Sequence, residues 1–191
     1  KGLIYQSHKV MYICPRCSTP LSNFEVTQGY KDIKDLAVTA KFKLLDTTDE
    51  IYLLAWTTTA WTLPGNMFLA VNPDLDYVLV EEKSTAEKYY LAKSRLEEVF
   101  ADRDYQIVKT VKGQDLVGLN YQPPFSYFGH LKEDQDLPQA ARKLIFTVQA
   151  ADFVNLEDGT GIVHVAPAFG EDDYQLGESL LNFSNLETAV K

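Results

Sequence analysis

Apolar and polar residues alternate along much of the chain with the period of two that is typical of half-buried β-strands. Residues 36–45 and 105–111 follow this alternation, and the apolar runs at 51–54, 67–71 and 77–80 fit strands that are buried on both faces. Weaker patterns predict further short strands at 9–13, 23–26, 144–148, 153–154 and 162–165. Many short strands with few helices predict a mixed α/β, mainly β fold, in which a closed or nearly closed β-barrel carries peripheral helices.

Two segments have helical character. Ser84 can cap a helix, Glu87 follows at the spacing of a capping box, and an apolar stripe continues to Phe100. A second helix is expected to begin near Glu171. The polar residues 129–138 between these segments predict a solvated, mobile loop. We therefore expect residues 1–191 to form one compact domain, with an irregular part at residues 1–30.

The residues that follow the strand at 51–54 combine three consecutive threonines, Thr57, Thr58 and Thr59, with Trp56 and Trp61. Three threonines in a row place hydroxyls on both faces of a strand, so at least one hydroxyl points inward and needs a partner. The plainer interpretation is an edge strand whose hydroxyls face solvent.

A second polar segment lies near the C-terminal end. His164 stands in the strand predicted at 162–165, and Asp172 and Asp173 fall in the first turn of the helix that follows. A histidine on an apolar strand is often a core residue, and carboxylates in a first turn are favoured by the helix dipole alone. Chemistry and ordinary structure both remain open for these residues.

Composition excludes several classes of protein. The chain is 46% hydrophobic and 12% aromatic, which is typical of a folded globular protein. Its formal net charge of −9 argues against a broad surface that tracks nucleic-acid phosphates, although one local pocket for a nucleic-acid end is compatible with it. Without a membrane-length apolar run or a signal peptide, we expect a cytoplasmic protein that does not contact membranes, and a monomeric chain.

The two cysteines, Cys14 and Cys17, have the CxxC spacing of half a four-cysteine zinc knuckle. The other half is absent from this sequence, so zinc would bind only if a longer protein supplied two more ligands. Inert thiols and redox chemistry are the alternatives.

Together, the two polar segments resemble a known family. The pattern WTTTxWTLPxN at residues 56–66 and GTGIVHxAPxxGxxD at residues 159–173 is similar to the double signature of the editing domain of isoleucyl-tRNA synthetases, a connective peptide inserted into a class I catalytic domain. The resemblance covers essentially the whole chain. Ala60 departs from it, because the family usually has proline there. Valyl and leucyl relatives share the second signature only loosely.

The resemblance implies an enzyme, namely an aminoacyl-tRNA ester hydrolase that acts after transfer. It would hydrolyse Val-tRNA(Ile) with a positioned water and exclude Ile-tRNA(Ile) by pocket size. Its partners would be the aminoacylated 3′ end of tRNA(Ile), the valine side chain and the rest of the parent synthetase. Editing would need no cofactor, whereas zinc and ATP would belong to the full-length enzyme. The HIGH and KMSKS signatures are missing, so aminoacylation is not expected.

The resemblance also assigns roles. Asp173 would hold the α-ammonium of the misattached amino acid, and Thr57, Thr58 and Thr59 would surround the ester, with Thr58 and Thr59 orienting it and the water. His164 would line the side-chain pocket, where its ring blocks the extra methylene of isoleucine. The remaining substrate-binding positions would be Trp56, Trp61 and Asn66. The sequence contains no GxSxG nucleophile elbow and no signal of a Cys–His pair.

Three alternatives remain open at this point. The chain could bind a tRNA acceptor end without hydrolysing it, it could be the editing domain of a valyl or leucyl relative, or its signatures could serve packing alone.

Overall fold

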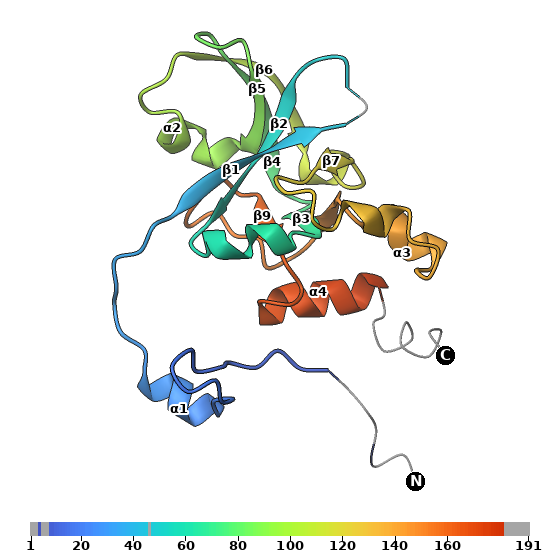
Figure 1. Ribbon diagram of the computed structural model, residues 1–191. Coiled ribbons are helices and arrows are strands. Elements are labelled where there is room, and N and C mark those ends of the chain that lie inside the picture. The colour runs from blue at the N-terminus through green and yellow to red at the C-terminus, as the bar shows by residue number, and fades with distance from the viewer. Residues whose placement is uncertain (1–3, 5–7, 46, 182–191) are drawn as a thin grey trace.

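The computed structural model describes residues 4, 8–45 and 47–181, and its centre is one curved β-sheet (Figure 1). The sheet has nine strands: β1 (Val38–Leu44), β2 (Ile51–Thr57), β3 (Phe68–Val71), β4 (Asp76–Glu82), β5 (Lys88–Ala92), β6 (Tyr105–Lys112), β7 (Tyr121–Gln122), β8 (Thr147–Ala150) and β9 (Val163–Val165). The strands predicted at 36–45, 51–54, 67–71, 77–80, 105–111 and 162–165 are confirmed.

The strand order is β6-β4-β5-β2-β9-β3-β8, and β1 pairs with both β2 and β7. Strand β2 lies parallel to β5 and to β9, whereas β1 runs antiparallel to it. The prediction of a closed or nearly closed barrel is wrong, because the sheet curls into an open half-barrel. A barrel needs a continuous ladder around its axis. Here β6, β4 and β5 extend beyond β2. Beside β8 the ladder is reduced to an isolated bridge between Asn120 and Thr147, with three further backbone hydrogen bonds between residues 118–121 and 146–148.

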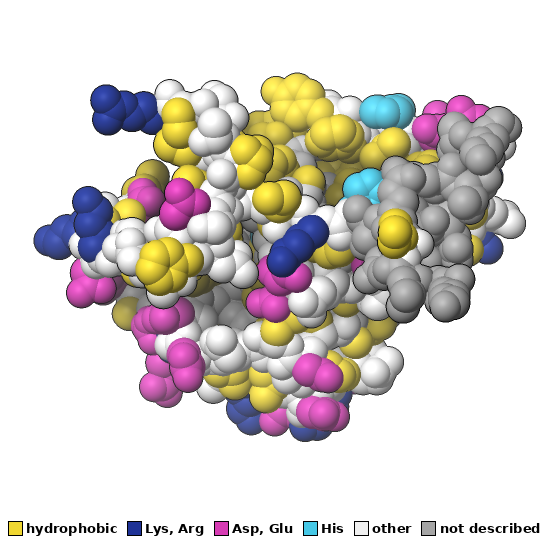
Figure 2. Space-filling model, turned by 90° about the horizontal axis from the view of Figure 1, so that it is seen from below, with side chains coloured by type: hydrophobic (Ala, Val, Ile, Leu, Met, Phe, Trp, Pro, Cys, Tyr) yellow, Lys and Arg dark blue, Asp and Glu magenta, His cyan; other side chains and the backbone are white. Residues whose placement is uncertain are grey.

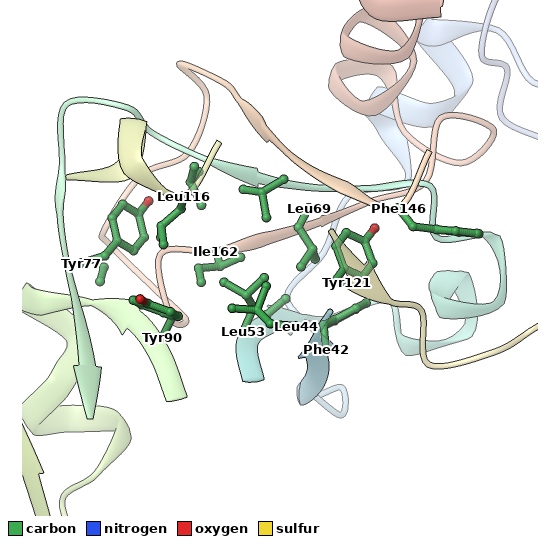
Figure 3. Packing of buried hydrophobic residues seen from close by; sticks show 14 of the residues in the cluster. Phe42, Leu44, Leu53, Leu69, Tyr77, Tyr90, Leu116, Tyr121, Phe146 and Ile162 are labelled. Carbon is green, nitrogen blue, oxygen red and sulfur yellow. The ribbon is translucent and has the colours of Figure 1, made fainter. Parts of the chain in front are cut away.

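The concave side of the sheet encloses the largest hydrophobic cluster (Figure 3). Phe42 from β1, Leu53 from β2 and Leu69 from β3 are fully buried there. Tyr121 contacts Phe42 edge to face, with ring centroids 5.4 Å apart. This cluster fixes the relative positions of the strands that carry the polar segments.

The helix predicted from Ser84 to Phe100 is wrong over most of its length. Residues Lys88–Ala92 form strand β5, and only a 3-10 turn, η2 (Lys93–Arg95), and the short helix α2 (Leu96–Val99) follow it. Tyr89 and Tyr90 pack into different clusters on opposite sides of the sheet, which is the side-chain period of a strand. Burial of two adjacent tyrosines on opposite faces therefore overrides the capping pattern at Ser84.

Four smaller predictions also need correction. Residues 23–26 form part of helix α1 (Asn23–Gln28), because Ser22 and Glu25 make a reciprocal capping box. The strand expected at 144–148 begins only at Thr147, since Leu144 ends helix α3 (Gln139–Leu144). Residues 153–154 form no strand, and residues 9–13 contribute one bridge, between Ile13 and Pro20.

The remaining helical segments lie around the sheet. The 3-10 helix η1 (Ala60–Gly65) follows β2, η3 (Gly113–Asp115) follows β6, and η4 (Gly129–Lys132) falls within the predicted loop at 129–138. Helix α4 (Glu171–Leu181) follows β9 and confirms the helix expected near Glu171. Figure 1 shows α1 beyond α4 from the sheet, joined to β1 by an extended segment.

On the described part of the face in Figure 2, Lys and Arg side chains occur singly, among acidic and hydrophobic ones. That distribution agrees with the net charge of −9 and gives this face no continuous basic surface. In the described ranges, no helix has the length and apolar character needed to cross a bilayer.

Gly161, in the connection between β8 and β9, has a positive φ of 73°, and an added Cβ would lie 2.3 Å from the Cβ of Ala92. We expect Gly161→Ala to destabilise the protein by about 2–5 kcal/mol, because a left-handed backbone cost adds to overpacking. Gly118→Ala is the matched control, since Gly118 has a φ of 86° with open space around its Cβ position. It should lose only the backbone part, about 1–2 kcal/mol. Urea unfolding measures both changes, and equal losses would show that Ala92 moves aside without cost.

Candidate functional site

A cavity of about 360 Å³ opens where β2 ends, between the connection to β9 and the start of α4. Six of the eight predicted catalytic and substrate-binding residues line it: Trp56, Thr57, Thr58, Thr59, His164 and Asp173. They come from β2, the residues after it, β9 and α4. The fold thus brings the two polar segments of the sequence to one place.

Thr57, Thr58 and Thr59 form a loop at the end of β2, called the threonine loop below, which is held by internal hydrogen bonds. The Thr57 side chain is buried, and its hydroxyl oxygen accepts a hydrogen bond from the backbone N–H of Thr59 over 3.1 Å. The hydroxyls of Thr57 and Thr59 are 3.3 Å apart. Thr58 and Thr59 are exposed, so their side chains can meet a ligand in the cavity. Thr57 therefore holds the loop from within, and its two neighbours face the opening.

Asp173 lies in the first turn of α4 and is partly buried. Its Oδ2 accepts a hydrogen bond from the backbone N–H of Ala166 over 2.9 Å, which fixes the carboxyl group against the end of β9. Burial raises the pKa of the Asp173 carboxyl above its ordinary value. A partly desolvated carboxyl group gains most from a cation placed beside it. Asp172 is exposed and does not line the cavity.

His164 is buried, with 6% of its surface exposed, and both ring nitrogens are occupied by protein groups. Nδ1 lies 2.8 Å from Nδ2 of Asn66, and Nε2 lies 3.1 Å from the hydroxyl of Thr62. The Asn66 amide nitrogen also donates to the carbonyl of Phe68 over 2.9 Å, which fixes which end of the amide is the donor. Nδ1 therefore accepts, and Nε2 carries the proton.

Burial lowers the pKa of His164 to about 4, so the ring is neutral at physiological pH. Since one nitrogen accepts from Asn66 and the other donates to Thr62, neither is available to move a proton on a ligand. The imidazole ring therefore lines the cavity as an uncharged group whose orientation is held by two hydrogen bonds, and this ring is called the wall of the cavity below. This arrangement suits a side-chain pocket and does not suit a general base.

Trp61 and Asn66 lie outside the cavity lining. Trp61 is 69% exposed on η1 and packs edge to face on Phe169, beside a second cavity of about 700 Å³ that is mostly apolar. Asn66 is 2% exposed and acts from beneath, through its bond to His164. Trp56 borders both the first cavity and a neighbouring one that contains Lys41 and Arg95.

The sequence analysis missed two acidic residues of the lining, Glu157 and Asp158, which lie in the connection between β8 and β9. With Asp173 they give the cavity three carboxyl groups, and no Lys or Arg among the described residues lines it. The cavity therefore favours a positively charged group. Glu157 and Asp158 lie in an irregular segment after the buried Val154, and such a segment has no hydrophobic periodicity from which they could have been predicted.

Cys14 and Cys17 occupy a tight turn, in which the N–H of Ser18 donates to the carbonyl of Cys14 over 2.8 Å. Hydrogen bonds from Thr19 and Cys14 lower the pKa of the Cys17 thiol. The pair supplies two thiolate donors of the kind zinc prefers. The described residues contain no group of three or more His, Cys, Asp or Glu placed to hold a metal ion. A complete centre would need ligands from outside this set.

Comparison with known proteins decides the family. Residues 1–167 match the family model described as tRNA synthetases class I (I, L, M and V). The chain belongs to this family.

Three relatives show the closeness of the match. The chain is 45% identical over 179 residues to isoleucine–tRNA ligase of Bacillus thuringiensis (strain Al Hakam), with 94% of the chain and 16% of the ligase covered. It is 47% identical over 176 residues to the same ligase of Bdellovibrio bacteriovorus, with 91% of the chain and 16% of the ligase covered. The Thermoplasma acidophilum ligase is 46% identical over 177 residues, with 93% and 16% covered. The chain thus spans only a small part of these relatives.

Solved structures show the same fold. GlLeuRS-CP1 superposes with a TM-score of 0.62 at 18% identity, covering 81% of this chain and 64% of that one. The editing domain of P. knowlesi cytosolic leucyl-tRNA synthetase gives a TM-score of 0.57 at 15% identity, with 78% and 64% covered. At this identity the likeness establishes the architecture alone.

The buried His164 predicts a pH-dependent stability. Its folded pKa of about 4 lies below the ordinary 6.5, so the unfolded chain takes up a proton that the folded chain does not. Stability should fall as the pH drops from about 6.5 to about 4, by about 3 kcal/mol at most. Urea unfolding of wild type and His164→Gln at pH 7 and pH 4.5 measures this. Asp173 is present in both proteins, so its opposite contribution cancels in the difference. Equal pH dependence in the two proteins would contradict the prediction.

Proposed function

We propose that this chain is a post-transfer editing domain that hydrolyses the ester of Val-tRNA(Ile) and excludes Ile-tRNA(Ile) by the size of its pocket. The observation that supports this proposal most directly is the shared cavity, which is lined by a partly buried carboxyl group, threonine side chains and a neutral imidazole. The match to isoleucine–tRNA ligases at 45% identity favours this specificity over that of a valyl or leucyl relative.

Asp173 would anchor the substrate. The α-ammonium of an aminoacyl ester is a compact cation, and Asp173 can offer Oδ1 to it while Oδ2 stays bound to the backbone of Ala166. Glu157 and Asp158 add to the negative potential of the cavity. A charge-assisted hydrogen bond in a partly dry site holds the amino acid in one orientation.

The threonine loop would place the water and the ester. An aminoacyl ester is labile, so the reaction needs an oriented water more than a covalent nucleophile. The water oxygen adds to the carbonyl carbon of the ester, the bond from that carbon to the ribose oxygen breaks, and the ribose oxygen takes up the proton that the water loses, which restores the ribose hydroxyl. The products are the free amino acid and tRNA with an intact 3′ end. The hydroxyls of Thr58 and Thr59, two exposed residues that line the cavity, would orient these partners.

His164 would act as the sieve. A pocket that favours isoleucine over valine gains only about 1–3 kcal/mol from the extra methylene, so a second pocket that excludes the larger side chain is needed for accuracy. The ring of His164 is held on both nitrogens, so it cannot easily turn away from a side chain that is too large. This editing needs no group beyond water and the chain's own residues.

The deciding measurement is deacylation of Val-tRNA(Ile) and Ile-tRNA(Ile) by the 191-residue chain. Wild type should hydrolyse the valyl ester alone. Asp173→Asn should slow that reaction by about tenfold to a hundredfold, the loss expected for one charge-assisted hydrogen bond. Asp172→Asn is the matched control and should retain the wild-type rate, because this neighbour is exposed outside the cavity.

Binding of a non-hydrolysable valyl-adenosine analogue without turnover would instead indicate a module that binds the acceptor end only. If the chain showed no binding of the analogue and no turnover of either ester, the proposal would be overturned.

Truncation of the wall should change specificity. His164→Ala removes the ring and should let the chain hydrolyse Ile-tRNA(Ile) at a rate within about tenfold of that for the valyl ester, since the steric term is lost. The same deacylation assay measures both rates. His130→Ala, a change on η4 away from the cavity lining, should leave isoleucine excluded. Continued rejection of the isoleucyl ester by His164→Ala would assign the sieve to another side chain.

A further inference from the structure

A chain of buried hydrogen bonds begins on the opposite side of His164 from the cavity. The hydroxyl of Tyr121 donates to Oδ1 of Asn66 over 2.7 Å. Asn66 in turn donates from Nδ2 to Nδ1 of His164 over 2.8 Å. Tyr121 is fully buried and stands 55 residues from Asn66 in the sequence.

The direction of each bond is fixed by chemistry. The carbonyl of Phe68 can only accept, so the Asn66 atom beside it is the amide nitrogen, and the other end of the amide is the oxygen that faces Tyr121. Burial raises the pKa of Tyr121 well above 10, so its hydroxyl keeps the proton that it donates. The protonated tyrosine pairs the amide oxygen of Asn66, the amide nitrogen then faces Nδ1 of His164, and the imidazole proton is left on Nε2.

The aromatic ring that carries this hydroxyl is firmly held. Tyr121 packs edge to face against Phe42 at 5.4 Å and against Phe146 at 6.2 Å between ring centroids, and Figure 3 shows its ring among these residues. Phe42 also stacks on His164, with centroids 6.5 Å apart and ring planes at 20°. The same aromatic group therefore supports the first and the third member of the chain.

The chain continues to the threonine loop. Nε2–H of His164 donates to the Thr62 hydroxyl over 3.1 Å, and that hydroxyl donates to the backbone carbonyl of Thr59 over 2.8 Å. One hydrogen-bonded path thus runs from Tyr121 through His164, the wall of the cavity, to the threonine loop.

We propose that Tyr121 is a positioning residue for specificity. It pairs the oxygen of Asn66 and, together with the Phe68 carbonyl, keeps that amide where it holds the tautomer and ring orientation of His164, and so the shape of the wall that excludes a larger side chain. This role rests on the proposed editing function. A phenylalanine would satisfy the packing against Phe42 and Phe146 equally well. The buried hydroxyl has value only because Asn66 would otherwise keep an unpaired oxygen.

The test combines imidazole ¹⁵N spectra with the deacylation assay, using Tyr121→Phe and Tyr89→Phe. Tyr89 is 1% exposed as a residue, but its hydroxyl lies in a partly buried cluster with Lys41 and Glu87, outside the cavity lining. Tyr89→Phe is therefore the control for loss of a tyrosine hydroxyl elsewhere in the sheet. The sequence has three histidines, and His164→Gln assigns the relevant signals. Wild type and Tyr89→Phe should show a single Nε2–H tautomer for His164. Tyr121→Phe should show a mixture of tautomers and a valyl-to-isoleucyl rate ratio reduced by about tenfold, the size of one lost buried hydrogen bond.

Two results would overturn the proposal. One is a Tyr121→Phe protein that keeps the wild-type tautomer and rate ratio. The other is a Tyr89→Phe protein with an equal loss of the ratio, since that would reduce the effect to general stability. A wild type that hydrolyses neither ester would refute the editing function itself, and the spectra would then decide by themselves whether Tyr121 orients His164.

A second variant tests the direction of the path. Asn66→Asp keeps the shape of the side chain but replaces the amide donor with a carboxylate, so Nδ1 of His164 should become protonated and donate to it. The tautomer should then reverse to Nδ1–H, with Nε2 accepting from Thr62. An Nε2–H tautomer that persists in Asn66→Asp would contradict the assigned path.

Discussion

A histidine buried in a β-sheet must find partners for both ring nitrogens inside the protein, and this requirement shapes the whole site. His164 meets it with Asn66 on one side and Thr62 on the other. Thr62 lies within η1 and Asn66 directly follows it, so satisfying the ring also fixes how the chain leaves β2 and enters β3. The threonine loop, the wall of the cavity and the aromatic cluster below it therefore form one mechanical unit.

The sequence predicted well those features that depend on local pattern. The alternation at 36–45 and 105–111 became β1 and β6, and the clustered threonines became the loop beside the cavity. His164 and Asp173 could be expected at one site because each stood in a recognisable motif, and both line the cavity. The motifs show only where these residues stand along the chain. Parallel pairing of β2 with β9 is what brings His164 close to the threonines.

Features that depend on distant contacts could not be predicted. The capping pattern at Ser84 indicated a helix, but Tyr89 and Tyr90 each gained a separate hydrophobic cluster by forming a strand. Closure of the barrel failed for a similar reason, because pairing of β5 with β2 extended the sheet sideways. Asn66 was predicted among the substrate-binding residues, but its burial and its contacts with Phe68 and Tyr121 depend on distant parts of the chain and carried no sequence signal.

The parallel pairing of β2 with β9 has a consequence for synthesis of the protein on the ribosome. Thr62 and His164 are 102 residues apart, so the cavity joins residues that follow β2 to a part of the chain that is translated much later. Such non-local contacts form slowly and only after the intervening chain is complete. A nascent chain that ends before β9 has its threonines but neither His164 nor Asp173. The cavity can therefore form only late in synthesis, after the residues that complete its lining have been added.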